Sequence, residues 1–144
     1  GTVTGKRLAV LGFAFKADTN DTREAPAIRI CRDLLEEGAQ LAIHDPKVEP
    51  AQMARDLQQE AADAADALSG TGSWALAGSV EEAVVGADAV LILTEWRQYR
   101  ELNWQELAGR MRRPAWVFDS RAVTDPEQVR AAGLTLWRVG DGEG

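Results

Sequence analysis

Short apolar segments alternate with longer segments of helical periodicity along most of this chain. The apolar segments predict strands at Arg7 to Gly12, Gln40 to His44, Trp74 to Ala77, Ala89 to Thr94, Trp116 to Asp119 and Thr135 to Val139. Several are continuous runs of Val, Ile, Leu and Ala, which is typical of parallel strands covered on both faces. We therefore expect an α/β fold with three αβα layers and a parallel sheet of about six strands, in the order 3-2-1-4-5-6.

The segments between the strands predict helices with recognisable ends. The first helix is expected from Ala25 to Glu37, with Pro26 in its first turn and Asp21 or Thr22 as its cap. A second helix, from Pro50 to Leu68, has few large apolar residues, and a loop is expected over residues 68–73. Polar residues predict the start of three further helices: Ser79 with Glu82 in a capping box, Asn103, and Asp125 followed by Pro126.

The composition describes one ordinary globular domain. Of the 144 residues, 45% are apolar and 27% are charged, and the formal net charge is -7. The acidic residues are spread along the chain, which argues against a nucleic-acid surface. No apolar run approaches the ~18 residues of a membrane span, and no signal peptide is recognisable. We expect a soluble protein of a reducing, cytoplasmic compartment.

The single cysteine, Cys31, cannot form an internal disulfide. Its neighbours in the first predicted helix are apolar, so we interpret it as a small buried hydrophobic residue rather than a catalytic thiol. The sequence shows no Ser/His/Asp set, paired carboxylates or metal-ligand spacing, and its single histidine limits acid-base chemistry. It therefore favours a ligand-binding domain over a complete enzyme.

The first strand, turn and helix resemble a dinucleotide-binding unit only superficially. The turn reads Gly12-Phe13-Ala14-Phe15-Lys16, without the Gly-x-Gly-x-x-Gly spacing that lets bare backbone approach a pyrophosphate. We therefore do not expect this domain to hold NAD in the usual Rossmann manner. Asp45 ends the second strand where an acidic residue would bind a ribose, but with Pro46 it could equally form a turn.

Three cations follow strand ends or precede a helix at the predicted carboxyl edge of the sheet, where anions collect. Lys16 fits a phosphate or a developing oxyanion, or it is a solvated surface lysine. Arg23 precedes a helix start, where a cation opposes the helix dipole and a ligand or acidic partner would explain it. Arg121 either joins an anion site or pairs with a carboxylate such as Asp119. Glu95 could orient one of these cations.

Five blocks in the same order and spacing make the chain similar to the C-terminal, UDP-binding domain of the UDP-glucose 6-dehydrogenase family, within the UDP-glucose/GDP-mannose dehydrogenases. Together they cover nearly the whole chain. They are Leu11-Gly12-Phe13-Ala14-Phe15-Lys16, Asp18-Thr19-Asn20-Asp21-Thr22-Arg23-Glu24, Gly38 with His44-Asp45-Pro46, Ala89 to Trp96, and Phe118-Asp119-Ser120-Arg121. The chain departs from the family where Ser120 or Ala122 stands in place of a frequent glycine.

This resemblance implies a Rossmann-like domain, residues 1–144, of a longer enzyme that oxidises UDP-glucose to UDP-glucuronate with two NAD. The N-terminal NAD domain and a central helical region with the nucleophilic cysteine would lie outside this chain, and Cys31 does not match that cysteine. Phe15, Lys16 and Arg121 would contact the UDP-sugar, whereas Arg23 would reach NAD across the cleft. The isolated domain is then expected to be inactive and the full-length enzyme to be a homo-oligomer, with a role in polysaccharide biosynthesis.

Two other interpretations stay open at this stage. The chain could be a non-catalytic module that senses a nucleotide or docks a partner. It could also belong to a dehydrogenase of the same family that acts on another nucleotide sugar.

Overall fold

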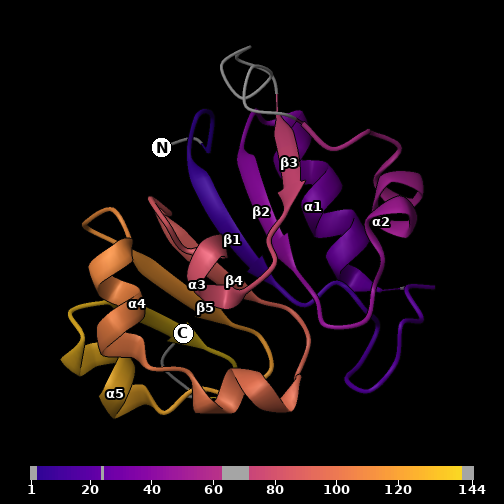
Figure 1. Ribbon diagram of the computed structural model, residues 1–144. Coiled ribbons are helices and arrows are strands. Elements are labelled where there is room, and N and C mark those ends of the chain that lie inside the picture. The colour runs from indigo at the N-terminus through magenta and orange to yellow at the C-terminus, as the bar shows by residue number, and fades with distance from the viewer. Residues whose placement is uncertain (1–2, 24, 63–71, 141–144) are drawn as a thin grey trace.

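A six-stranded parallel sheet forms the centre of the molecule in the computed structural model, which describes residues 3–23, 25–62 and 72–140 (Figure 1). The strand order is β3-β2-β1-β4-β5-β6, which confirms the predicted order. The strands are β1 (Arg7–Leu11), β2 (Gln40–His44), β3 (Ser73–Leu76), β4 (Ala89–Ile92), β5 (Trp116–Asp119) and β6 (Thr135–Arg138). Every pair of neighbouring strands is parallel, so all the carboxyl ends meet at one edge.

Helices form the outer layers of the predicted αβα arrangement. They are α1 (Pro26–Glu36), α2 (Pro50–Leu57), α3 (Val80–Ala83), α4 (Trp104–Arg110) and α5 (Pro126–Ala131), with a 3-10 helix, η2 (Arg97–Glu101), before α4. Helices α1 and α2 contact each other, as do α4 and α5. Right-handed crossovers place the first pair on one face of the sheet and the second pair on the other.

The caps of the later helices confirm the sequence-based predictions. The side chains of Ser79, Asn103 and Asp125 each accept a hydrogen bond from a backbone N–H in the first turn of α3, α4 and α5, at 3.0, 3.1 and 3.0 Å. Pro126 opens α5, where its missing N–H costs nothing.

Two helix predictions were wrong. The N-cap of α1 is Ala25, which has no side-chain cap, so neither Asp21 nor Thr22 caps this helix. Helix α2 ends at Leu57 rather than Leu68, because Gln58 adopts the left-handed conformation at φ 56°. The residues of the predicted second helix and following loop that fall within 63–71 lie outside the described residues.

Cys31 lies in α1, and its side chain is fully buried in the core. Burial raises the pKa of its thiol to about 12, so the reactive thiolate is scarce at neutral pH. The structure thus confirms a packing role for this cysteine.

Gly12 brings the turn after β1 directly against β4. Its φ is +97°, and a Cβ built there would collide with the side chain of Thr94. Thr94 in turn donates from Oγ1 to the carbonyl of Ala14 at 2.8 Å. A glycine is therefore required for the close approach of the turn after β1 to Thr94 at the carboxyl edge. Within the described residues, no helix has the length and apolar character to cross a membrane.

Candidate functional site

Asp45 organises the carboxyl edge at the centre of the sheet. It follows β2 and is buried, and its two carboxylate oxygens accept hydrogen bonds from five donors. These donors are the backbone N–H groups of Phe13, Ala14, Lys47 and Val48 and the indole Nε1 of Trp96, at 2.8 to 3.1 Å. The carboxylate is committed to a turn and to holding the loop after β1, so it is not free to bind a ribose.

Arg121 holds the same loop from the other side. Its Nη1 forms an ion pair with Glu95 at 3.0 Å, its Nε donates to the carbonyl of Leu93 at 3.1 Å, and its Nη2 donates to the carbonyl of Phe15 at 3.1 Å. The side chains of Arg121 and Glu95 remain 31% and 30% exposed. A guanidinium has five N–H donors, so Arg121 keeps donor capacity for a ligand. The side chain of Arg121 therefore forms its ion pair with Glu95 rather than with Asp119.

Glu95 links the pieces of this edge. One carboxylate oxygen pairs with Arg121, and the other accepts the backbone N–H of Ala17 at 2.9 Å. Asp119, which is buried, instead accepts the backbone N–H of Arg121 at 3.0 Å and both donors of Thr124. The expected orienting role of Glu95 is confirmed.

Phe15 and Lys16 project from backbone that is fixed on several sides. The Phe15 N–H donates to the carbonyl of Asp21 at 2.7 Å, and its own carbonyl binds Arg121. Phe15 is nevertheless 43% exposed, and Lys16 is exposed as well. The structure therefore brings Phe15, Lys16 and Arg121 together on one edge, with an aromatic ring and two cations facing solvent.

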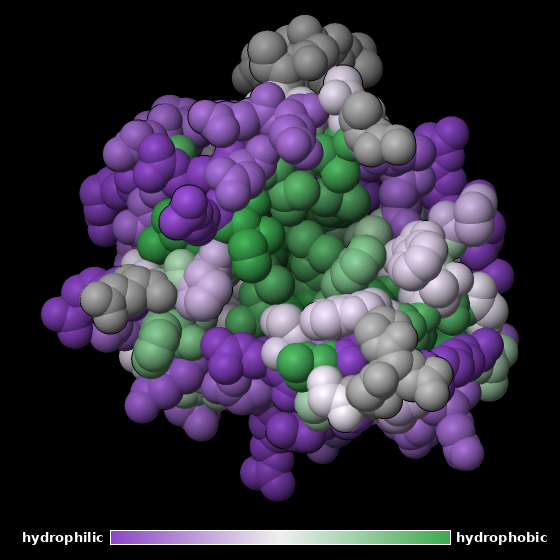
Figure 2. Space-filling model, turned by 180° about the vertical axis from the view of Figure 1, so that it is seen from behind, coloured by the Kyte–Doolittle hydropathy of each residue, from purple (hydrophilic) through white to green (hydrophobic). Residues whose placement is uncertain are grey.

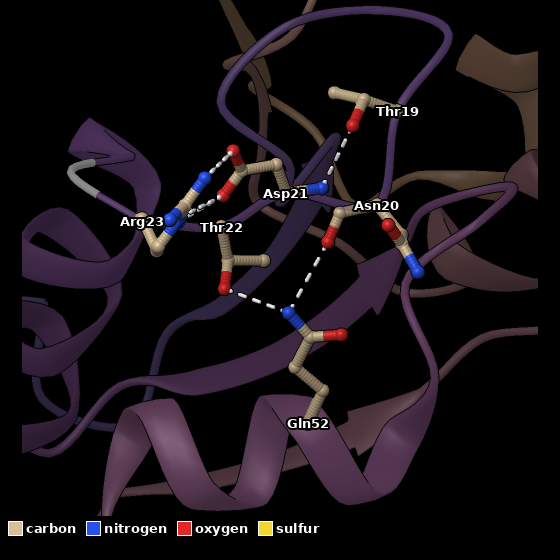
Figure 3. A network of polar contacts seen from close by, with 6 residues as sticks. All are labelled: Thr19, Asn20, Asp21, Thr22, Arg23 and Gln52. Carbon is tan, nitrogen blue, oxygen red and sulfur yellow. Dashed lines mark hydrogen bonds and ion pairs between the residues drawn. The ribbon is translucent and has the colours of Figure 1, made fainter.

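Residues 18–23, the second half of the loop between β1 and α1, are anchored to α2 mainly through Thr22 (Figure 3). Thr22 is buried; its hydroxyl donates to Asp56 at 2.6 Å and accepts from Nε2 of Gln52 at 2.8 Å. The same Gln52 nitrogen also donates to the carbonyl of Asn20 at 3.1 Å. Thr22 therefore fixes the loop to a helix instead of capping α1.

Arg23 extends into solvent from this anchored segment, and its side chain is 88% exposed. Its Nε and Nη2 donate to the two carboxylate oxygens of Asp21 at 3.1 and 3.0 Å. These hydrogen bonds lower the pKa of Asp21 and raise the pKa of Arg23. The structure thus gives Arg23 a local acidic partner, and its contacts are separate from the cluster around Arg121.

Two buried aromatic residues that follow β4 pack beneath the carboxyl edge of the sheet. Trp96 and Tyr99 are both buried. The Tyr99 hydroxyl lies 2.9 Å from Nδ1 of His44 and 3.1 Å from the His44 carbonyl. Burial lowers the pKa of His44, against opposing attraction from Asp45 and Glu81. These residues are part of the fold's support, not of an exposed site.

Sequence reasoning missed the anchor at Thr22 and the bond from Trp96 to Asp45. Both join residues more than 30 positions apart, and no local motif marks them. The described residues contain no group of three or more His, Cys, Asp or Glu placed to hold a metal ion. The arrangement can therefore bind an anion next to an aromatic ring, and the described part shows no metal centre.

The fold and this cation-bearing edge define a Rossmann-like ligand-binding domain. Residues 9–126 match the pattern of the UDP-glucose/GDP-mannose dehydrogenase family, UDP binding domain, and the chain belongs to this family. It is 43% identical over 146 aligned positions to UDP-glucose 6-dehydrogenase 5 of Oryza sativa subsp. japonica. That alignment covers 96% of this chain but only 30% of the rice protein.

Solved structures of related enzymes have the same fold. A UDP-D-ManNAc dehydrogenase from Pyrococcus horikoshii superimposes with a TM-score of 0.72 at 25% identity, covering 99% of this chain and 27% of the other. A UDP-glucose dehydrogenase from Pyrobaculum islandicum superimposes with a TM-score of 0.62 at 26% identity, covering 96% of this chain and 26% of the other. The chain therefore spans under a third of the length of these relatives.

Proposed function

We propose that this chain is the UDP-sugar-binding domain of a UDP-glucose 6-dehydrogenase, a longer enzyme that oxidises UDP-glucose to UDP-glucuronate with two NAD. Membership of the UDP-binding family supports the nucleotide, and 43% identity to a rice UDP-glucose 6-dehydrogenase supports the sugar. On this proposal the chain is one domain, and an N-terminal NAD domain and a central helical region complete the enzyme.

The juxtaposition of Phe15, Lys16 and Arg121 carries the proposal. Hydrogen bonds to Asp21, Glu95 and Asp119 hold the backbone in and next to these residues, so little order has to be created when a ligand binds. The Phe15 ring offers a face to a base or sugar, and Lys16 and the remaining N–H groups of Arg121 offer charge-assisted bonds to a diphosphate. This combination suits a nucleotide sugar better than a purely apolar or purely ionic ligand.

The residues of this domain do not fit a complete NAD site. The turn after β1 carries Phe15 and Lys16 where a pyrophosphate needs bare backbone, and the Asp45 carboxylate already accepts five hydrogen bonds. We therefore propose that another domain holds NAD, and that Arg23 contributes from across the cleft. The exposed guanidinium of Arg23 can leave Asp21 at little cost because surface ion pairs are weak.

Steady-state kinetics of the full-length protein with Lys16→Ala and Arg23→Ala test both roles. Loss of a charge-assisted hydrogen bond of about 1.5–3 kcal/mol predicts that Lys16→Ala raises KM for UDP-glucose roughly 10- to 150-fold. Arg23→Ala should raise KM for NAD and leave KM for UDP-glucose unchanged. Lys47→Ala, an exposed lysine that follows β2 on the same edge, is the matched control and should change neither.

Three outcomes would contradict this proposal. An unchanged KM for UDP-glucose in both Lys16→Ala and Arg121→Ala would remove the assigned substrate contacts. A full-length protein that binds UDP but turns over no nucleotide sugar would instead indicate a nucleotide-sensing module. Equal KM changes for UDP-glucose and NAD in Arg23→Ala would place Arg23 elsewhere.

A second candidate is a dehydrogenase of the same family that acts on another nucleotide sugar. The UDP-D-ManNAc dehydrogenase from Pyrococcus horikoshii superimposes with a larger TM-score than the UDP-glucose dehydrogenase from Pyrobaculum islandicum, 0.72 against 0.62, and this favours the second candidate. Turnover of UDP-N-acetylmannosamine in preference to UDP-glucose by the full-length protein would select this candidate.

A further inference from the structure

The second half of the loop between β1 and α1 has no apolar residue. Figure 2 shows apolar side chains gathered in the middle of one face of the molecule, with hydrophilic residues around them. Residues 18–23, in contrast, are all polar or charged, and Thr22 is the one buried residue among them. Polar contacts therefore have to hold this segment in place, because it has no apolar residue to bury.

Two side chains of α2 supply these contacts. Gln52 and Asp56 are half-buried and four positions apart, so they lie on the same face of the helix. Figure 3 shows Gln52 pointing from α2 toward the loop, where its Nε2 donates to the carbonyl of Asn20 at 3.1 Å and to Oγ1 of Thr22 at 2.8 Å. The Thr22 hydroxyl donates to Oδ2 of Asp56 at 2.6 Å. These bonds hold the loop on both sides of Asp21.

The chemistry of the two partners fixes the direction of each bond at the Thr22 hydroxyl. The amide nitrogen of Gln52 can only donate, whereas the carboxylate of Asp56 accepts, so the single hydroxyl proton points to Asp56. A buried hydroxyl that is bonded in both directions has little freedom to rotate. The two α2 side chains together therefore give Thr22 one defined orientation.

The position of Arg23 depends on this anchor. Arg23 directly follows Thr22, and its guanidinium contacts Asp21, which lies between the two anchored residues. The side chain of Arg23 is 88% exposed, so packing contributes little to the direction in which it extends. The region that the guanidinium can reach is therefore set by its backbone, and the backbone at Thr22 is held by α2.

We propose that Gln52 and Asp56 are positioning residues for the cofactor, and that they act through Thr22 on Arg23. The inference deepens the proposed function and rests on it, because it takes Arg23 to be the group that meets NAD. Gln52 and Asp56 act without touching NAD, since they hold the backbone from which Arg23 reaches a cofactor bound to another domain. Order that exists before binding lowers the entropic cost of that contact.

Loss of this anchor should affect the cofactor and spare the nucleotide sugar. Arg121 holds the carbonyl of Phe15 and Glu95 holds the N–H of Ala17, and neither of these partners belongs to α2. The N–H of Phe15 also donates to the carbonyl of Asp21 at 2.7 Å. The first half of the loop keeps its other bonds when the α2 anchor is lost. A change in KM that is confined to NAD therefore distinguishes positioning from general damage to the domain.

Steady-state kinetics of the full-length protein with Gln52→Ala and Thr22→Val test the proposal. Both should raise KM for NAD about 3- to 10-fold, which is the range for loss of one hydrogen bond, and leave KM for UDP-glucose and kcat within roughly twofold. The rise should not exceed that of Arg23→Ala, which removes the contact itself. Thr22→Ser keeps the hydroxyl and should restore the wild-type KM. Gln128→Ala, at an exposed position in α5, is the matched control and should change neither KM.

A double-mutant cycle identifies the route of the effect. If Gln52 acts through Arg23, Gln52→Ala should add nothing to KM for NAD in the Arg23→Ala protein, because the group that it positions is gone. Effects that multiply in the double variant would show that Gln52 acts by another route, and would overturn the proposal. An equal rise in KM for UDP-glucose and for NAD in Gln52→Ala would also overturn it, since that is the mark of general damage.

Amide hydrogen exchange of the full-length protein without NAD separates the anchor from the assigned role of Arg23. Gln52→Ala should speed exchange of residues 18–23 about threefold or more and leave residues 13–17 unchanged. Asp56→Ala, which removes the other α2 partner, replaces Thr22→Val if that variant does not fold. Unchanged exchange of residues 18–23 would overturn the anchor.

The two measurements together distinguish failure of the inference from failure of the proposed function. Faster exchange with an unchanged KM for NAD in Gln52→Ala, while Arg23→Ala still raises that KM, would overturn the positioning role and leave the proposed function intact. An unchanged KM for NAD in Arg23→Ala would instead contradict the assigned role of Arg23, and the positioning role with it.

Discussion

The two halves of the loop after β1 are held in different ways. Residues 13–17 bond through their backbone to Asp45, Glu95 and Arg121, which come from the ends of three different strands. Residues 18–23 are fixed to α2 mainly through Thr22, and the pair of Arg23 with Asp21 is local and exposed. The first half therefore presents Phe15 and Lys16 from a fixed backbone, whereas the side chain of Arg23 can change its conformation. A fixed backbone suits a ligand bound within this domain, and a movable side chain suits a ligand that another domain holds.

Removing the carboxylate at Asp45 should destabilise this fixed backbone most. Asp45→Ala leaves five donors without an acceptor, four of them backbone N–H groups, so we expect a loss of about 3 kcal/mol or more in the free energy of unfolding. Urea denaturation of the 144-residue chain measures it. Asp21→Ala, in the exposed half, should leave stability unchanged within error. Equal losses in the two variants would contradict the difference between the halves.

Substitutions of Arg121 and Lys16 should differ in their effect on stability but agree in their effect on substrate binding. Arg121→Ala removes an ion pair and two bonds to backbone carbonyls, which predicts a loss of about 1–2 kcal/mol in the free energy of unfolding. Lys16→Ala should leave unfolding unchanged, since its side chain is exposed. Both variants should raise KM for UDP-glucose in the full-length enzyme. A stable Arg121→Ala domain would mean that its contacts do not hold the loop.

Ala122 offers a gain in stability next to Arg121. It has a φ of +58°, which costs an L-residue with a Cβ about 1 kcal/mol relative to glycine. Ala122→Gly should therefore raise the free energy of unfolding by up to about 1 kcal/mol, measured by urea denaturation. Ala51→Gly, at an exposed position in α2, should lower stability by up to a similar amount. A loss of stability in Ala122→Gly would show that the strain at this turn is relieved elsewhere.

The sheet was predictable from the sequence because its signals are local. Continuous apolar runs located every strand to within two residues at each end, and the crossover rule set their order. Caps at Ser79, Asn103 and Asp125 were also predictable, because the acceptor and the donor lie two or three residues apart. The family resemblance added the roles of Phe15, Lys16, Arg23 and Arg121, which stay predictions.

The support of the site was less predictable because its contacts are long-range. The ion pair of Arg121 with Glu95 joins two strand ends, whereas spacing along the chain suggested a neighbouring carboxylate such as Asp119. Thr22 looked like a helix cap by its position, yet the loop turns it toward Asp56 of α2. The prediction of the end of α2 was wrong for a different reason. Gln58 adopts a left-handed conformation, which is not expected from its residue type.

A pH titration of stability tests the packing beneath the fixed half. His44 precedes Asp45, and burial lowers its folded-state pKa below the ordinary 6.5. The unfolded chain therefore binds a proton first as the pH falls through 6.5, so the free energy of unfolding should fall between pH 7.5 and pH 5.5. Because this is the only histidine among the 144 residues, His44→Gln should flatten that slope while lowering stability at both pH values. An equal slope in wild type and His44→Gln would assign the pH dependence to carboxylates and leave the His44–Tyr99 contact without a part in it.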